Sequence, residues 1–162
     1  MFKKLLLLVV TGFFLASCAA TNTNQGGDSD ASASSSGSDG SITAGTQEDL
    51  IVNVGDRVFF EFDSSDLTVD AQATLDAQAA WLMQYPDTNI TIEGHADERG
   101  TREYNLALGD KRAFAVYSYL AQAGIDTNRM EYISWGKERP EVVGSDETAY
   151  SQNRRGVTTV TN

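Results

Sequence analysis

The side chains best suited to binding chemistry lie in the segment that runs from Glu93 to Arg112. Within it, Asp97 follows an apolar strand pattern, and Arg112 lies in the helix pattern that comes next. A carboxylate can bind an ammonium group, and a planar guanidinium can bind a carboxylate through two hydrogen bonds. If Asp97 and Arg112 face one pocket, that pocket suits a zwitterionic amino-acid headgroup. The spacing alone also allows a simple salt bridge between the two residues that orients the loop.

The loop between the strand and the helix offers a second way to bind a charged group. Gly100 and Thr101 precede the helix pattern, so free backbone N–H groups at the helix start could receive an anion. Ligands of open α/β sheets commonly bind at the carboxyl ends of strands. Arg112 comes about three helical turns after Thr101, ~16 Å along a straight helix. A helix break at Gly109 would bring Arg112 back toward the loop.

The elements that must position these residues form one α/β domain from 48 to 162. Periodic apolar residues predict four strands, at 57–62, 89–94, 130–135 and 156–161, and three helices, at 68–85, 101–123 and 147–152. The second helix is either bent or divided at Gly109. The alternation predicts a two-layer α/β sandwich, with helices packed on a mixed four-stranded sheet in the order β-α-β-α-β-(α)-β.

Composition excludes several classes of function. The chain has 23 acidic and 12 basic residues, a net charge of −11, so no basic excess exists to bind nucleic acid. It has one Cys and one His, which excludes an internal disulfide and a zinc cluster, and we predict no metal and no cofactor. His95 as a catalytic base would need a nucleophile, and no Gly-x-Ser-x-Gly motif supplies one. We therefore expect no enzyme activity and a satisfied His95 that braces the loop.

The N-terminus has the pattern of an export signal. Two lysines precede an apolar stretch over 5–15 that is too short to span a bilayer, and small residues lead to Cys18, the only cysteine. This arrangement resembles a bacterial lipobox, with a signal peptide over 1–17 and acyl chains on Cys18. Two or more acyl chains give stable membrane anchoring. The alternative is a plain secretory signal. By analogy, Ala19 favours the outer membrane over inner-membrane retention.

Residues 18–47 are rich in Ser, Gly, Asp and Ala, with one large apolar residue, Ile42. Such a segment cannot bury enough surface to offset chain entropy, so a disordered linker is predicted. A Gly/Ser-rich coil of this length spans about 30 Å on average. The linker therefore lets the domain behind it reach away from the membrane.

An ordered set of positions between 55 and 162 carries a family resemblance. The set comprises Phe60-Glu61-Phe62-Asp63, Gly94-His95-Ala96-Asp97, Gly100, Tyr104-Asn105, Leu108-Gly109, Arg112-Ala113, Gly136, Pro140 and Asn153-Arg154-Arg155. It closely resembles the peptidoglycan-associated lipoproteins, which are members of the OmpA-like peptidoglycan-binding domain family. The lipobox and the linker agree with that resemblance. Arg102 departs from it, since some members have Pro there.

The resemblance implies an outer-membrane lipoprotein that binds peptidoglycan without a covalent bond and tethers the membrane to the cell wall. The ligand would be the meso-diaminopimelate of the stem peptide. Asp97 would bind its ammonium group and Arg112 its carboxylate. The remaining contacts would come from Thr101, Tyr104, Asn105 and, near the rim, Asp63. The roles of Arg154 and Arg155 are less defined, and one of them could only brace the helices.

The resemblance also implies a second partner, the periplasmic propeller protein of the Tol system, and with it a role in the Tol-Pal system of cell division and envelope integrity. Two alternatives stay open at this point. The chain could be an adaptor that binds only a periplasmic protein, or a peptidoglycan hydrolase.

Overall fold

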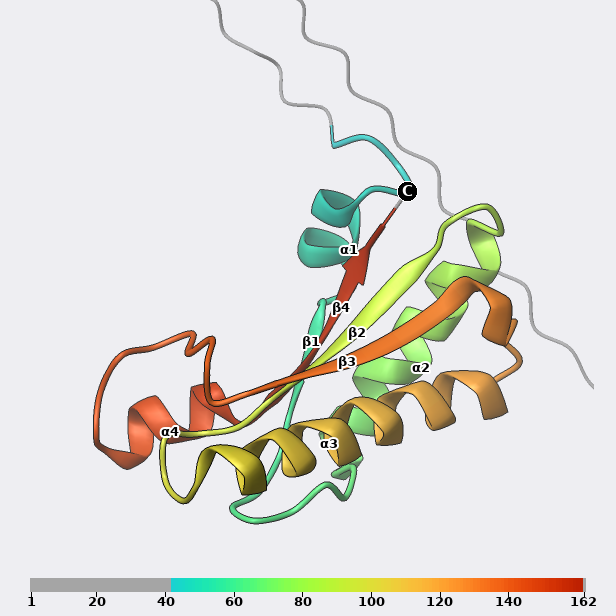
Figure 1. Ribbon diagram of the computed structural model, residues 1–162. Helices are drawn as coiled ribbons and strands as arrows, with labels where there is room; N and C mark the ends of the chain where they lie inside the picture. Colours follow the sequence, from blue (N-terminus) through green and yellow to red (C-terminus); the bar gives the residue numbers. More distant parts are fainter. Residues whose placement is uncertain (1–41, 162) are drawn as a thin grey trace, which may run out of the picture. The chain divides into compact units, whose positions relative to one another are not determined.

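The computed structural model describes residues 42–161, and Figure 1 shows the elements in this range. Cys18 and the predicted signal peptide lie outside the described residues. The elements are α1 (Gln47–Asn53), β1 (Arg57–Phe59), α2 (Val69–Gln84), β2 (Ile90–His95), α3 (Arg102–Gln122), the 3₁₀ turn η1 (Thr127–Arg129), β3 (Met130–Gly136), α4 (Glu147–Asn153) and β4 (Arg155–Val160). None of the helices in this range is long and apolar enough to cross a bilayer.

The sheet has four strands in the order β1-β4-β2-β3. β2 and β3 are parallel, whereas β4 is antiparallel to both β1 and β2. The helices α2 and α3 pack on one face of the sheet, as Figure 1 shows. The core between the layers contains Val58, Leu75, Leu82, Ile90, Ile92, Val116 and Leu120. The predicted two-layer α/β fold with a mixed four-stranded sheet is confirmed.

The first strand is shorter than the predicted 57–62. It ends at Phe59, although the N–H of Phe60 still donates to the carbonyl of Arg154 at 2.9 Å. Asp63 then adopts a positive φ of 55°, which no strand residue has. The turn that follows directs the backbone carbonyls of this loop toward α3, where they contact the site described below.

The helix α1 is absent from the elements predicted from sequence. Its buried residues are Asp49 and Leu50, so its apolar pattern is too short to recognise. Long-range contacts hold it: the indole N–H of Trp81 donates to the Asp49 carboxylate at 2.9 Å, and the N–H of Val160 donates to the Gln47 side chain at 2.6 Å. The described residues from 42 to 47 therefore belong to the segment that the composition assigns to a linker.

Gly109 does not break α3, which is one helix from Arg102 to Gln122. Its lack of a side chain instead lets α3 approach β2 closely, because a Cβ atom on Gly94 would overlap the carbonyl of Gly109. The reverse contact is also tight, since a Cβ atom on Gly109 would lie 2.8 Å from the carbonyl oxygen of Gly94. The glycine pair therefore sets the distance between the helix and the strand that carry the site.

The variant Gly94→Ala tests this close approach. We expect it to lower the free energy of unfolding by about 2 kcal/mol, because the added methyl group forces α3 away from β2. Chemical denaturation of the wild type and the variant measures the difference. Lys111→Ala, at an exposed position of α3, is the control and should change stability by less than ~0.5 kcal/mol. Equal stability of the wild type and Gly94→Ala would contradict the packing role.

Candidate functional site

A small pocket lies at the carboxyl end of β2, where the chain passes through a loop into α3. Its volume is about 190 Å³. It is lined by Phe62, Asp63, Ala96, Asp97, Arg99, Gly100, Tyr104, Asn105, Leu108 and Arg112. Asp97 and Arg112 thus line one pocket, as the sequence spacing allowed.

Arg112 is fully buried at the floor of the pocket, with 0% exposure. Its Nε donates to the carbonyl of Ser64 at 2.8 Å, Nη1 to that of His95 at 2.9 Å, and Nη2 to that of Glu61 at 3.1 Å. Because each terminal nitrogen carries two N–H groups, one N–H on Nη1 and one on Nη2 are not used by these three bonds. Such a pair matches the two oxygens of a carboxylate.

Burial, followed by repulsion from Arg154, lowers the pKa of Arg112 to about 10, so the guanidinium stays charged at neutral pH. A helix break is not needed to bring this charge to the loop. The strand end at His95 and the loop that carries Glu61 and Ser64 instead close around the side chain. The pocket therefore has a fixed positive charge at its floor.

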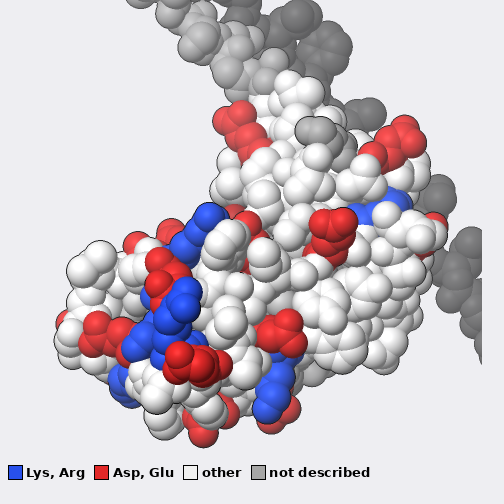
Figure 2. All heavy atoms as spheres, viewed as in Figure 1, with Lys and Arg blue, Asp and Glu red and all other residues white. Residues whose placement is uncertain are grey.

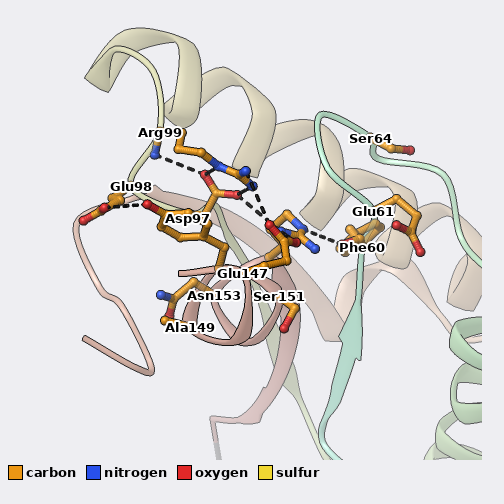
Figure 3. Close-up of polar contacts among 12 residues, drawn as sticks. Phe60, Glu61, Ser64, Asp97, Glu98, Arg99, Glu147, Ala149, Ser151 and Asn153 are labelled. Atoms are coloured by element: carbon orange, nitrogen blue, oxygen red, sulfur yellow. Dashed lines mark hydrogen bonds and ion pairs between the residues drawn. The ribbon is translucent and has the colours of Figure 1, made fainter. Parts of the chain in front are cut away.

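Asp97 supplies the negative charge, and its side chain is also buried, with 5% of the residue exposed. Arg99 donates to it from the backbone N–H at 3.1 Å and from Nη2 at 2.6 Å, and Nη1 of Arg154 lies 3.5 Å away. Figure 3 shows the Asp97 carboxylate directed at the guanidinium of Arg99. Among the described residues, the ion pairs of Asp97 are with these two arginines, so the alternative of an Asp97–Arg112 salt bridge is not formed.

The electrostatics of Asp97 favour the charged form. Burial alone would raise its pKa, but the hydrogen bonds from Arg99 and the charges of Arg99 and Arg154 outweigh burial, so the pKa of Asp97 lies below its ordinary value. The carboxylate is therefore ionised at neutral pH. A carboxylate oxygen can accept more than one hydrogen bond, so an ammonium group can join these partners.

Arg99 is a pocket residue that the sequence analysis did not identify. Its guanidinium lies between the rings of Phe62 and Tyr150, at 4.2 and 4.3 Å from their centroids, and also approaches Glu147 at 3.4 Å. The only signal in the sequence is that Arg99 lies two residues after Asp97, a spacing that is common in turns. The aromatic rings come from two distant segments, so the stacking could not be read from the chain.

The other predicted contacts divide into two groups. Asp63, Tyr104 and Asn105 line the pocket; the Tyr104 hydroxyl donates to the Asp63 carboxylate, and the Asn105 amide donates to the carbonyl of Arg99 at 2.8 Å. Thr101 is not among the lining residues. Its side chain caps α3 by accepting the N–H of Tyr104 at 3.2 Å, so it positions the helix start.

The two terminal arginines have different contacts. Arg154 donates through Nε to the carbonyl of Phe60 at 3.0 Å, and its Nη1 lies 2.7 Å from Glu147 as well as near Asp97. Arg155 points elsewhere and approaches Glu141 at 3.4 Å. Arg154 therefore belongs to the charge network of the pocket, whereas Arg155 braces the loop before α4.

His95 contributes its backbone carbonyl to Arg112, while its ring lies buried with 2% exposure. Burial, and next the positive charge of Arg155, lowers the pKa of His95 to about 4. The charge of Arg139 also lowers this pKa, whereas a hydrogen bond with the backbone of Arg139 and the charge of Glu141 raise it. The ring is thus neutral in the folded protein at neutral pH, and its Nε2 lies 3.5 Å from the carboxylate of Glu93.

The lowered pKa of His95 predicts a pH-dependent stability. Between about pH 6.5, the ordinary value, and pH 4, the unfolded chain binds a proton at His95 that the folded chain does not. The contribution of His95 to the free energy of unfolding is therefore complete above pH 6.5 and is lost as the pH falls toward 4. Chemical denaturation at half-unit pH steps should show a positive slope of stability with pH in this window. His95→Gln should flatten that slope, and an unchanged slope would contradict the assignment.

Comparison with known proteins identifies the family of this chain. A profile of the OmpA family matches residues 59–154. The chain belongs to the OmpA family. Its relatives in this family include the peptidoglycan-associated lipoprotein of Rhizobium meliloti, which is 60% identical over 119 residues, or 74% of this chain and 68% of that protein. The peptidoglycan-associated lipoprotein of Haemophilus influenzae is 40% identical over 156 residues, 96% of each chain.

Solved structures of OmpA-like domains share the fold. The crystal structure of the peptidoglycan-associated lipoprotein from Burkholderia pseudomallei superposes with a TM-score of 0.64 and 44% identity, over 65% of this chain and 90% of that chain. The C-terminal domain of Helicobacter pylori MotB superposes with a TM-score of 0.61 at 21% identity, over 66% and 84% of the two chains, which shows the fold alone. Among residues 42–161 of this OmpA-family chain, no group of three or more His, Cys, Asp or Glu side chains could hold a metal ion.

Proposed function

We propose that this chain is a lipid-anchored protein of the cell envelope that binds peptidoglycan non-covalently through the pocket of Asp97 and Arg112. The names of its relatives support association with peptidoglycan and the lipid anchor. The observation that carries the proposal is the placement of an ionised carboxylate and a charged guanidinium in one pocket of about 190 Å³. No catalytic step is part of this function.

The ligand that fits this charge pattern is a zwitterionic amino-acid centre. The free centre of meso-diaminopimelate carries one ammonium and one carboxylate group on a single carbon. Its carboxylate can accept the two unused donors of Arg112, and its ammonium can join Arg99 at the Asp97 carboxylate. The pocket volume suits such a headgroup. Tyr104 and Asp63 close one side of the pocket.

The position of the pocket suits a tether. Figure 1 shows α1 beside the end of β4, and the pocket lies at the far end of β2, which is antiparallel to β4. The chain that leads to the lipid anchor thus enters the domain at the end of the sheet opposite the pocket. We propose that residues 1–17 are a signal peptide, that Cys18 is acylated in the outer membrane, and that residues 18–47 link it to the domain.

A second proposed partner is the propeller protein of the Tol system, which would place the chain in Tol-Pal function during cell division. This part of the proposal rests on the resemblance of the Gly94–Arg112 segment to the peptidoglycan-associated lipoproteins. Both partners would sit near the Asp97 loop, so we expect competition between them. Bound sacculi that retain the propeller protein undiminished would contradict that competition.

A comparison of two soluble ligands tests the binding chemistry without changing the protein. Lysine differs from diaminopimelate by lacking the carboxylate of the far centre. A stem tripeptide that ends in meso-diaminopimelate should release the domain from sacculi, whereas the tripeptide that ends in lysine should be at least ~30-fold weaker, since two N–H donors of Arg112 lose a charged acceptor. Sedimentation of sacculi with increasing tripeptide measures both.

The outcomes separate the alternatives. Equal competition by the two tripeptides would show that Arg112 does not bind the far carboxylate of diaminopimelate. A protein that ignores sacculi but binds the propeller protein would be an adaptor for a protein partner only. Release of soluble muropeptides from sacculi would identify a hydrolase instead.

A further inference from the structure

A second hollow lies between α3 and β3, on surface that the peptidoglycan pocket does not use. This groove has a volume of about 550 Å³. It is lined by Glu103, Leu106, Ala107, Asp110, Tyr132, Ile133 and Ser134. None of these residues lines the pocket of Asp97 and Arg112, so the proposed function does not explain the groove.

The groove continues into an exposed aromatic cluster. Tyr132 lies 5.6 Å from Phe114 and 5.2 Å from Tyr117 between ring centroids. Phe114 is 50% exposed, Tyr132 41%, and Leu106, one helical turn before Asp110, 48%. Large apolar side chains on one continuous surface commonly mark a site of protein interaction.

The backbone beside the groove is also open. β3 is an edge strand, paired within residues 42–161 with β2 alone. Every second residue of an edge strand directs its N–H and C=O away from the sheet. Proteins usually protect such edges with Pro, Lys, a bulge or a short strand. β3 has seven residues from Met130 to Gly136 and contains neither Pro nor Lys, and its one register irregularity with β2 lies at its end, between Ser134 and Gly136. Its edge can therefore accept another strand.

Charge decides which occupant fits. The groove itself contains Glu103 and Asp110 and no basic side chain, and Glu131 is exposed on the same strand. Figure 2 shows few charged side chains over the face of β3 and α3, with acidic groups and one basic group over α3, while the Lys and Arg side chains gather mainly at the α4 end. An acidic rim around an apolar floor attracts a basic partner.

The same charges disfavour the two occupants that this chain could supply. Two copies joined edge to edge at β3 would bring their Glu131 side chains and groove carboxylates together, which repels. The segment 18–41 contains three Asp and no Lys or Arg, and no large apolar residue to fill the groove. The partner must therefore come from another protein.

We infer that the groove between α3 and β3 binds an extended segment of a second protein, in which apolar residues alternate with Lys or Arg. The segment adds as a fifth strand to the edge of β3, with its backbone bonded to that strand. Its apolar side chains enter the groove between Leu106 and Tyr132, and its basic side chains lie on the opposite face of the sheet, on the side of Glu131. Strand addition of this kind takes its affinity from the backbone and its specificity from alternate side chains.

The probe is a blocked nine-residue peptide that alternates Lys and Val, carries a fluorophore, and is titrated with the full chain in detergent micelles. Anisotropy should show binding at least 10-fold tighter than for the matching Glu–Val peptide. The double variant Asp110→Lys with Glu131→Lys should weaken binding at least 10-fold. The control double variant, Asp66→Lys with Asp87→Lys, makes the same change in net charge at exposed positions away from the groove and should weaken it less than threefold.

The groove is distinguished from the pocket in the same experiment. Asp97→Asn should leave peptide binding unchanged, and the Asp110/Glu131 double variant should still sediment with sacculi. Equal weakening by the two double variants would overturn the inference, because attraction would then be a property of net charge. Failure to bind the Lys–Val peptide up to 1 mM (roughly −4 kcal/mol), or a dimer in analytical ultracentrifugation that Glu131→Lys with Ile133→Lys dissolves, would also overturn it.

Discussion

Asp97→Asn is expected to weaken binding to diaminopimelate-type peptidoglycan about 100-fold. The ammonium group of the ligand then enters the pocket without its counter-charge, and truncating one member of such a charge pair costs about 2–5 kcal/mol. The substitution keeps the shape of the side chain, which is 5% exposed and held by Arg99. Sedimentation of purified sacculi over a range of protein concentrations measures the change. Circular dichroism confirms that the variant is folded.

The control for this variant is Glu103→Gln. Glu103 is an exposed acid in the first turn of α3, near the pocket but not among its lining residues. Glu103→Gln makes the same change in net charge as Asp97→Asn. Its binding to peptidoglycan should stay within about threefold of the wild type, as expected for an exposed charge. If both variants bind as tightly as the wild type, the pocket is not the peptidoglycan site.

The sequence could predict the fold because each major element carries a local pattern. The helix α2 begins where Thr68 caps it by accepting the N–H of Ala71 at 3.1 Å, and the cap is visible in the chain. β2 and β3 contain alternating or continuous apolar residues that pair in parallel across a helical crossover. The short α1 has no such pattern, since contacts with Trp81 and β4 hold it.

The site was predictable only in part, for a similar reason. Asp97 lies two residues after the end of β2, and the resemblance to a family predicts Arg112 as its companion. The three acceptors of Arg112 are backbone carbonyls, two of them 48 and 51 residues away in the chain, and a carbonyl has no residue type to signal it. Arg99 was missed because its stacking on Phe62 and Tyr150 exists only after folding.

These carbonyls give Arg112 a structural role besides the ligand-binding role that we propose. Arg112→Gln should lower the free energy of unfolding by about 3–5 kcal/mol, because carbonyls of Glu61, Ser64 and His95 lose charged donors in a buried site. Chemical denaturation measures this loss. Arg102→Gln is the matched control; its side chain is 72% exposed and pairs with Glu138, so the loss there should stay below about 1 kcal/mol.

Loss of sacculus binding by the Arg112 variant would by itself be ambiguous, since a weakened loop between β1 and α2 could also abolish it. Ligand stabilisation separates the two causes. A tripeptide that ends in meso-diaminopimelate, at 100 times its dissociation constant, should stabilise the wild type by about 2.7 kcal/mol. The same tripeptide concentration should not raise the free energy of unfolding of Arg112→Gln, because the pocket floor of this variant no longer presents two charged donors. Equal stabilisation of both proteins would show that Arg112 serves the fold alone and that another group receives the carboxylate.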